Sequence, residues 1–482
     1  MSLVVPTLAN SRACWIRRWR RACATASRVR ARRTSAASHV FLLLGLAWLC
    51  YACGVQRAVS PMKGGNDGKH MTSETPRYTA PSSHLLAHTE SLLSNTRGRG
   101  VNARNTAERL AKAKRAARGH GTIKLSFKRL DPKPDPVHGR PCARSSHGLS
   151  LVDAGRRLVL YGGEHIARTP LEPNQMLWLA DRIEDDENGN EAWQWRCIVI
   201  PQDEPQPPAR VAHAQAVVDD QFVYVFGGRD TAIEEEAMND LWKLDTRGLT
   251  WTKVDVESVH GTSALPPENR SYHRMVAVDQ SLYVFGGCGE NGRLADLHRF
   301  DVHACIWDDL GASPLLSGRG GPNLLVLGND DLAVVAGFAG KETADGHRFD
   351  SSQRRWQPAL LGGLDGLRPR SVCATGSYPS LGLVVVFGGE VDPSERGHEG
   401  AGGFANDIVL LDGKTAKYIQ TVVPPNSADV SPWPEARGWS DGASQDDGLG
   451  TGRLYIFGGL AGDDANPRRL DDLWVLDIES FG

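Results

Sequence analysis

The chain has 482 residues, of which 40% are hydrophobic and 23% are charged. This composition is globular and excludes a collagen, a wholly disordered chain and a polytopic membrane protein. The 52 glycines and 27 prolines make up about 16% of the residues, against a usual ~12%, which indicates many turns.

Charges of opposite sign are segregated along the chain. Residues 1–120 contain 21 of the 55 basic residues but only four of the 57 acidic ones. The remainder is acidic, with 34 basic and 53 acidic residues. An acidic body argues against nucleic acid as the main partner.

The first predicted element is an apolar run at residues 40–55 (VFLLLGLAWLCYACGV), which follows nine arginines within residues 1–33. A spanning helix needs about 20 residues, although about 17 is tolerated. We predict an Arg-rich cytosolic or targeting segment at 1–38, a signal anchor or transmembrane helix at 39–55 and a disordered basic stalk at 56–120. The predicted localisation is a single-pass membrane protein with its body in a lumen or outside the cell. A cleaved secretory signal, an organelle transit peptide and a buried core helix are the alternatives.

The nine cysteines form no metal-binding or redox pattern. Four of them lie within the first 53 residues. The other five are widely spaced and odd in number, so they do not indicate a disulfide framework. They are Cys142, Cys197, Cys288, Cys305 and Cys373.

From residue 121 onward, an apolar strand that ends in two glycines recurs. Its copies are 158–163 (LVLYGG), 223–228 (VYVFGG), 282–287 (LYVFGG), 383–389 (LVVVFGG) and 454–459 (LYIFGG), with a degenerate copy at 332–337 (LAVVAG). Successive copies are 50–70 residues apart, a period typical of repeat architectures. The glycine doublet supplies the backbone freedom for a tight strand exit.

Other residues keep the same register in each copy. Most doublets are followed by a second strand and then by an aromatic residue, which we expect to fill the wedge between adjacent sheets. These aromatic residues are Trp195, Trp251, Trp307, Trp356 and Tyr418. Each unit is therefore expected to contain four short strands, and six units predict an all-β fold, a six-bladed β-propeller over residues 121–480.

Ring closure gives a further prediction. The sixth unit ends near residue 480 and has no room for its own aromatic-bearing strand. A spare strand, Thr122–Leu130, precedes the first unit and carries Phe127 where the aromatic residue belongs. We predict that this strand pairs with the last blade, joins the two ends of the ring and protects the open sheet edge.

These residues resemble the kelch-repeat family over about residues 121–480. Within that family the chain is most similar to the plant nitrile-specifier and epithiospecifier group. The resembling stretches are 143–148 (ARSSHG), 162–164 (GGE), 336–339 (AGFA), 370–372 (RSV), 388–393 (GGEVDP), 397–400 (GHEG) and 437–439 (RGW). The resemblance implies a ferrous-iron-dependent redirection of glucosinolate aglycones toward nitriles, epithionitriles or thiocyanates.

A series of arginines is the first candidate site. One arginine precedes each doublet, and three of the six are followed three residues later by a histidine. The series comprises Arg144, Arg210, Arg270, Arg319, Arg370 and Arg437, with His147, His213 and His273. Arginines at one register are expected to ring one mouth of the central channel, where they would grip a carboxylate or sulfate. The alternative is that they pair with nearby carboxylates as repeat consensus residues.

Glu342, Asp345 and His347 form the second candidate site. Carboxylates with an imidazole suit Fe(II), and the specifier group's iron is attributed to a Glu/Asp/His set. The alternative explanation is repeat consensus, because residues 345–350 (DGHRFD) duplicate 296–301 (DLHRFD) one unit earlier and leave only Glu342 distinctive. On an extended strand, residues 342 and 345 also point to opposite faces.

The third candidate is the glycine-rich, charged segment 390–404, a loop that could carry binding or simply be solvated. Two functions are therefore open. The first is a binding module for an anionic small ligand or an acidic protein segment at the channel mouth, attached to a membrane through its anchor and needing no cofactor. The second is an Fe(II)-dependent, specifier-like lyase on the same fold.

Overall fold

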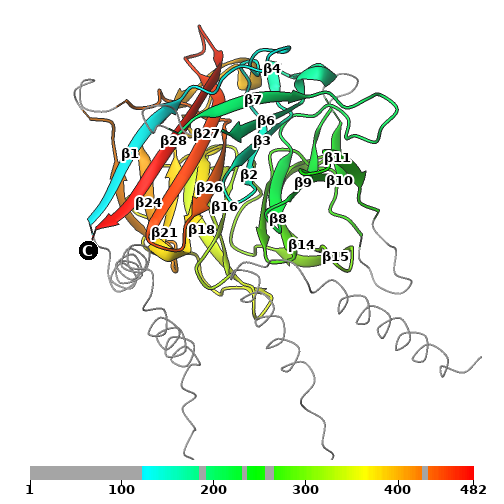
Figure 1. Ribbon diagram of the computed structural model, residues 1–482. Coiled ribbons are helices and arrows are strands. Elements are labelled where there is room, and N and C mark those ends of the chain that lie inside the picture. The colour runs from blue at the N-terminus through cyan, green and yellow to red at the C-terminus, as the bar shows by residue number, and fades with distance from the viewer. Residues whose placement is uncertain (1–121, 184–190, 231–235, 256–264, 426–431, 482) are drawn as a thin grey trace, which may run out of the picture. The chain divides into compact units, whose positions relative to one another are not determined.

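The repeats fold into six four-stranded antiparallel sheets arranged as blades around a central channel (Figure 1). The structure is a computed structural model that describes residues 122–183, 191–230, 236–255, 265–425 and 432–481. The six-bladed propeller predicted from the doublet spacing is confirmed.

The strands of the first three blades follow one another along the chain. Blade 1 comprises β2 (Gly148–Val152), β3 (Arg157–Tyr161), β6 (Leu177–Arg182) and β7 (Trp193–Ile198). Blade 2 comprises β8 (Ala214–Val218), β9 (Phe222–Arg229), β10 (Ala237–Asp245) and β11 (Thr250–Lys253). Blade 3 comprises β12 (Arg274–Val278), β13 (Ser281–Gly289), β14 (Gly292–Asp301) and β15 (Ile306–Ala312).

The last blade takes a strand from each end of the described chain. Blade 4 comprises β16 (Asn323–Val326), β17 (Leu332–Phe338), β18 (Glu342–Asp350) and β19 (Arg355–Trp356). Blade 5 comprises β20 (Ala374–Tyr378), β21 (Leu383–Phe387), β24 (Ile408–Asp412) and β25 (Tyr418–Val422). Blade 6 comprises β26 (Asp441–Asp446), β27 (Thr451–Ala461), β28 (Arg468–Phe481) and β1 (Thr122–Leu130).

Short hairpins and 3₁₀ turns lie between the strands of blades 1 and 5. Two small hairpins pair β4 (Glu164–Ile166) with β5 (Thr169–Pro170) and β22 (Glu390–Asp392) with β23 (Gly403–Phe404). Three 3₁₀ turns are η1 (Pro173–Gln175), η2 (Pro379–Leu381) and η3 (Gly397–Glu399). The segment 390–404, predicted as a loop, is therefore a hairpin with a 3₁₀ turn.

The predicted closure strand is confirmed. β1 pairs antiparallel with β28 from Thr122 opposite Phe481 to Leu130 opposite Leu473, and Figure 1 shows the two strands side by side in cyan and red. Phe127 is buried, and its ring lies 5.2 Å from that of Phe387 in blade 5. The closing strand therefore completes a hydrophobic core as well as a sheet edge.

The hydrophobic core consists of six clusters, one between each pair of neighbouring blades. Each cluster contains, or packs against, one of the aromatic residues predicted to fill the wedge, and Phe127 takes this place between blades 5 and 6. A blade cannot bury both faces alone, so each sheet is stable only between two others.

The glycine doublets provide the predicted backbone freedom. In blade 3, Gly286 and Gly287 have φ angles of 66° and 99°, a left-handed region that other residues adopt only with strain. A Cβ atom on Gly287 would lie 2.7 Å from the carbonyl oxygen of Ser271. In the degenerate copy of blade 4, Ala336 takes the first glycine's place at a φ of 62°.

The expected single-pass membrane localisation is contradicted. Within the described ranges, no helix is long and apolar enough to cross a membrane. The segments at 1–38, 39–55 and 56–120 lie outside the described residues.

Candidate ligand-binding site at the channel mouth

The six predicted arginines are all fully buried. In every blade, Nη1 donates to the carbonyl of the residue at the first doublet position, over 2.8–3.1 Å. In five blades the guanidinium also binds an aspartate that lies in the third strand or directly before it, through two hydrogen bonds of 2.6–3.3 Å. These pairs are Arg210–Asp240, Arg270–Asp296, Arg319–Asp345, Arg370–Asp407 and Arg437–Asp472.

The arginines therefore hold the strands of each blade together and do not present their charges at the mouth. Burial raises the pKa of Asp296, but hydrogen bonds from His298 and Arg270 outweigh it and keep that pKa below its ordinary value. The structure supports the pairing alternative, and anion binding by these arginines stays a prediction.

The three predicted histidines are also buried. Each packs edge-on against an aromatic ring of the preceding blade, with centroid separations of 5.4–5.6 Å. Burial, followed by the charge of Arg210, lowers the pKa of His213 to about 3. Burial likewise lowers the pKa values of His147 and His273, so all three side chains are neutral. They line a narrow cavity of about 40 Å³ on the propeller axis.

The predicted metal residues lie on one strand, β18, but do not converge. Asp345 pairs with Arg319. His347 is fully buried, accepts a hydrogen bond from Ser313 Oγ at Nδ1 (2.8 Å) and donates from Nε2 to the carbonyl of Gln357 (2.7 Å). Across the described part of the chain, no three His, Cys, Asp or Glu side chains form a group that could hold a metal ion. The set Glu342–Asp345–His347 thus does not fit an iron ion, and iron uptake stays a prediction.

A closed ring of backbone hydrogen bonds encircles the axis beside the buried arginines. The residue two positions after each arginine donates its N–H to the carbonyl of its counterpart in the preceding blade, over 2.8–3.0 Å. These inner-ring residues are Ser146, Ala212, Tyr272, Gly321, Val372 and Trp439. All six have φ angles of 49–59°, and five of them are not glycine. The ring thus places six positive-φ residues around the axis at the mouth of the channel.

A second ring surrounds the first. The residue after each doublet forms an isolated β-bridge with the residue after the arginine. These outer-ring residues are Glu164, Arg229, Cys288, Phe338, Glu390 and Leu460. The arginine repeats in every blade and the glycine doublet in five of them, whereas the inner-ring and outer-ring residues mostly differ from blade to blade. The mouth is therefore asymmetric, and the side chains that make it so are those of the inner and outer rings.

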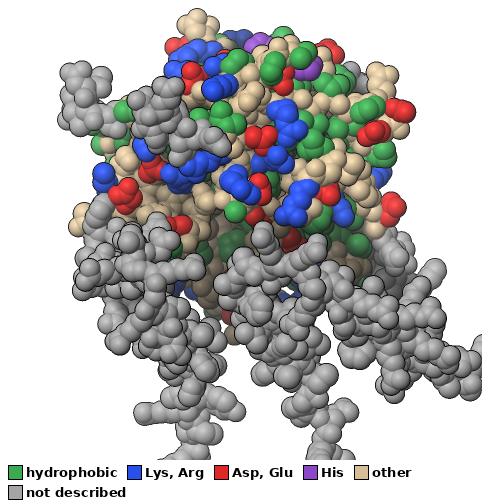
Figure 2. All heavy atoms as spheres, in the orientation of Figure 1, with side chains coloured by type: hydrophobic (Ala, Val, Ile, Leu, Met, Phe, Trp, Pro, Cys, Tyr) green, Lys and Arg blue, Asp and Glu red, His purple; other side chains and the backbone are tan. Residues whose placement is uncertain are grey.

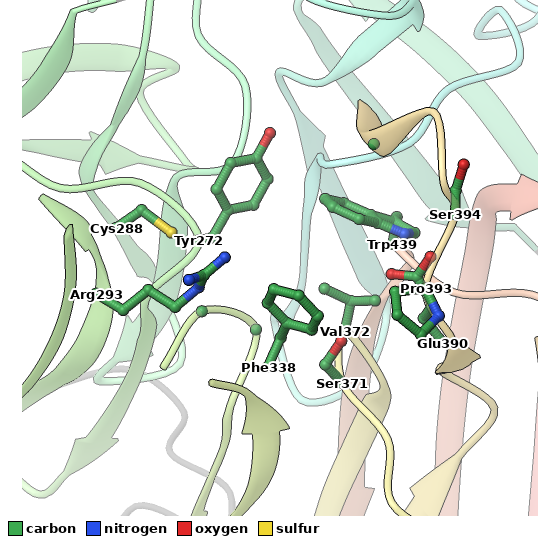
Figure 3. A pocket seen from close by; sticks show the side chains of 13 residues that line it. Tyr272, Cys288, Arg293, Phe338, Ser371, Val372, Glu390, Pro393, Ser394 and Trp439 are labelled. Carbon is green, nitrogen blue, oxygen red and sulfur yellow. The ribbon is translucent and has the colours of Figure 1, made fainter. Parts of the chain in front are cut away.

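Blades 3 to 6 enclose a cavity of about 280 Å³ at the mouth, which we call the mouth pocket (Figure 3). Its walls include three aromatic side chains, Tyr272, Phe338 and Trp439, and the rings of Tyr272 and Trp439 are 5.4 Å apart. Arg293 lies on one side of the pocket and Glu390 on the other, as Figure 3 shows. The guanidinium of Arg293 stacks 4.5 Å from the ring centroid of Phe338.

The hairpin that contains β22 and β23 supplies one wall of the mouth pocket. Glu390, Pro393, Ser394 and Gly397 all line it. The third candidate of the sequence analysis therefore contributes directly to the site, through Glu390 and the turn that follows it.

Two buried carboxyl groups lie at this wall. Burial raises the pKa of Glu390 to about 7. Burial and the charge of Glu390 raise the pKa of Glu342 to about 8. Ser371 Oγ donates to Glu342 Oε1 (3.1 Å), whereas Glu342 Oε2 has no hydrogen-bond partner among the described residues. Near neutral pH this pair therefore retains at least part of a proton, and Glu390 is the member of the pair that lines the mouth pocket.

The ion pair between Arg274 and Asp441 spans the channel below the narrow cavity, with an N–O distance of 2.9 Å. Arg274 comes from β12 of blade 3 and Asp441 from β26 of blade 6, on opposite sides of the ring. A ligand in the mouth pocket is therefore separated from the cavity of about 380 Å³ between the innermost strands.

Sequence reasoning missed Tyr272, Arg293, Phe338 and Trp439. For Tyr272, Phe338 and Trp439 the available signal was the position after each doublet or two residues after each arginine, where the repeats differ; Arg293 occupies neither position. On the face that Figure 2 shows, basic and acidic side chains are mixed, so total charge does not locate the site.

Comparison with known families bears on the whole propeller. A family model described as the KLHDC2/KLHL20/DRC7 Kelch-repeats domain matches residues 123–264 and 190–389, which together span more than half of the chain. The solved structure of YjhT superposes with a TM-score of 0.50 at 16% identity, over 69% of this chain and 95% of that one. This second likeness concerns the fold alone.

Three curated relatives differ in how much of them the chain covers. It is 25% identical over 345 residues to the N-(sulfonatooxy)prop-2-enimidothioate sulfolyase of Thlaspi arvense, covering 66% of this chain and 88% of that protein. It is 26% identical over 375 residues to the dynein alpha chain, flagellar outer arm, of Chlamydomonas reinhardtii, covering 72% of this chain and 7% of that protein. It is 27% identical over 258 residues to Adagio-like protein 3 of Oryza sativa subsp. japonica, covering 50% of this chain and 37% of that protein. The chain thus spans most of the first relative and well under two thirds of the other two.

Proposed function

Because this chain belongs to the kelch-repeat family of β-propellers, we propose that it is a binding module whose mouth pocket takes an anionic group attached to a planar apolar one. The observation that carries the proposal is the mouth pocket itself, where Arg293 stacks on Phe338 and the rings of Tyr272 and Trp439 also line the cavity. Aromatic walls favour a flat apolar body, and a guanidinium favours a carboxylate or sulfate.

The charge of Arg293 is available to a ligand. Its side chain is exposed, and within the described residues no carboxylate forms an ion pair with it. Stacking on Phe338 holds the guanidinium in place without neutralising it. Because its position is already fixed, the Arg293 side chain loses less conformational entropy when a ligand binds.

The raised pKa values of Glu390 and Glu342 support an acceptor-rich ligand. A protonated carboxyl group donates a hydrogen bond and does not repel an anion. With the carboxyl pair partly protonated and Arg293 charged, the pocket favours negative over positive ligands. The sulfonatooxy group named for the Thlaspi arvense relative is itself anionic, which is consistent with this preference.

A matched pair of probes tests the proposal. We would titrate the protein with 1-naphthoate and with 1-naphthamide, which share a ring system and differ in charge, using isothermal calorimetry. Naphthoate should bind more tightly, and Arg293→Ala should weaken it about tenfold or more, since a charge-assisted hydrogen bond contributes about 1.5–3 kcal/mol. Arg247→Ala, at an exposed turn of blade 2, is the control. Equal affinity for both probes, or an unaffected Arg293→Ala, would overturn the proposal.

A second candidate is a sulfolyase-like enzyme on the same fold, favoured by the 88% coverage of the Thlaspi arvense protein. Its expected ferrous iron would need ligands other than the set Glu342–Asp345–His347. Elemental analysis of protein purified without oxygen decides between the candidates. About one iron per chain supports the enzyme, whereas protein purified without iron supports the binding module.

A further inference from the structure

The mouth pocket has a positive end and a negative end. Arg293 of blade 3 and Glu390 of the β22–β23 hairpin both line it, and Figure 3 shows their side chains entering the pocket from opposite sides. Within the described ranges neither residue takes part in an ion pair. A charge in a partly closed pocket is unfavourable without a counter-ion, so both charges are left to pair with a ligand. The pocket therefore suits a ligand that carries opposite charges at its two ends.

Several carboxyl groups make the Glu390 end negative. Burial raises the pKa of Glu390 to about 7, and the charge of Asp464 adds to the rise. Burial, followed by the charges of Glu390 and Asp392, raises the pKa of Glu342 to about 8. Arg368 pairs with Asp392 at the surface (3.0 Å), but no cation of the described residues pairs with Glu342 or Glu390. A positively charged group of a ligand would offset this accumulated negative charge.

An organic ammonium group fits this end better than a metal ion. In the part of the chain that the structure describes, no three His, Cys, Asp or Glu side chains could hold a metal together. Trp439 lies beside Glu390 in Figure 3, and Tyr272 packs edge-on against Trp439. Aromatic faces attract ammonium groups, and more strongly where water is excluded. A carboxylate beside aromatic rings therefore suits an alkylammonium group.

We propose that the ligand of the mouth pocket is a zwitterion, with a flat apolar body, a carboxylate held by Arg293 and an ammonium group held by Glu390 and Trp439. This inference rests on the proposed function, since it keeps the anionic group at Arg293 and adds a second charged group at the opposite end. The ammonium group pairs with the ionised form of Glu390. An ammonium compound without a carboxylate leaves Arg293 unpaired and binds weakly.

Two probes of similar size isolate the contribution of the ammonium group. The first, 6-(aminomethyl)-2-naphthoate, carries an ammonium group opposite its carboxylate. The second, 6-(hydroxymethyl)-2-naphthoate, carries a neutral hydroxyl group at the same position. We would measure both by isothermal calorimetry at about pH 7.5, where alkylammonium groups are protonated. The aminomethyl probe should bind at least tenfold more tightly than the hydroxymethyl probe.

Three variants assign the difference to particular residues. Glu390→Gln keeps the size of the side chain and removes its charge, so it should weaken binding of the aminomethyl probe at least tenfold and should not weaken binding of the hydroxymethyl probe. Glu399→Gln, at an exposed position of the same hairpin, is the matched control and should change neither affinity. Arg293→Ala should weaken both probes, because both carry the carboxylate.

The results distinguish this inference from the proposed function. Equal affinities of the two probes would overturn the zwitterion, as would a folded Glu390→Gln variant that binds the aminomethyl probe as tightly as the parent. In either case a loss of affinity in Arg293→Ala would leave the proposed function standing. If Arg293→Ala weakened neither probe, both proposals would fall. If Glu390→Gln does not fold, the preference of the parent between the two probes decides.

Discussion

Replacing Asp296 by Asn tests the inference that the arginine series is structural. The substitution keeps the shape of the side chain and removes the charge that faces the fully buried Arg270, at N–O distances of 2.7 and 2.9 Å. Breaking a buried ion pair costs about 3–5 kcal/mol. The side chain of Asp296 is 24% exposed, which places the expected loss near the lower value, about 3 kcal/mol.

Calorimetric unfolding measures this loss. For a body of about 360 residues, an unfolding entropy of about 2.1 cal/mol/K per residue converts 3 kcal/mol into a drop of about 4 °C in Tm. Because the pKa of Asp296 is lowered in the folded state, the stabilisation is present above its ordinary value of 3.8 and is lost as the pH falls through the lowered pKa. The difference between parent and variant should therefore shrink in acid.

Two further variants complete the experiment. Asp203→Asn, at an exposed position, should change stability by no more than about 0.5 kcal/mol. Adding Arg270→Met to Asp296→Asn should recover part of the loss, because the unpaired buried charge is then gone. An Asp296→Asn variant as stable as Asp203→Asn would refute the structural assignment.

Phe127→Ala should cost about 3–5 kcal/mol in denaturant unfolding, because Phe127 fills the core between blades 5 and 6; a loss below about 1 kcal/mol would contradict that closure. Gly287→Val should lower the Tm, since a Cβ atom there would lie 2.7 Å from the Ser271 carbonyl oxygen and 2.8 Å from His273 Cβ; an unchanged Tm would show that the doublet is dispensable. Naphthoate affinity should fall as the pH rises through about 7, where Glu390 loses its proton. Glu390→Gln should reduce this pH dependence. A variant with the same pH profile as the parent would exclude Glu390 as the cause of the pH dependence.

The architecture could be predicted because each of the six units has the same structural requirements. A doublet needs φ angles that glycine adopts readily, a wedge between blades needs one aromatic ring, and the open end of the ring needs a strand. The repeat pattern alone placed Phe127 between the last blade and its neighbour. The other five units each have an aromatic residue at this position, and the sixth unit lacks its own.

The role of the arginines could not be read from the same pattern. Their register indicated a common place near the axis, but the side chain's surroundings depend on a partner that lies 26 to 37 residues later in the chain. Arg270 and Asp296 meet only after three strands have paired. The arginine that repeats in every unit is therefore structural. The residues proposed to bind a ligand are at positions where the repeats differ.

The mouth pocket was missed for a related reason. Arg293 is the second residue of β14 and belongs to no repeated motif, and it contacts Phe338 of the next blade only in the closed ring. Glu342 stood out in the sequence because repeat consensus did not account for it. It lies near the mouth pocket with a buried, unsatisfied oxygen, beside Ser371 rather than beside a metal ligand.

A crystal structure of the propeller grown with 1-naphthoate tests the central claim most directly. We predict density for the naphthyl ring against the aromatic side chains of Tyr272, Phe338 and Trp439 in the mouth pocket, with its carboxylate at the guanidinium of Arg293. A naphthoate bound outside these rings, or an Arg293 side chain turned away from a probe in the mouth pocket, would contradict the account.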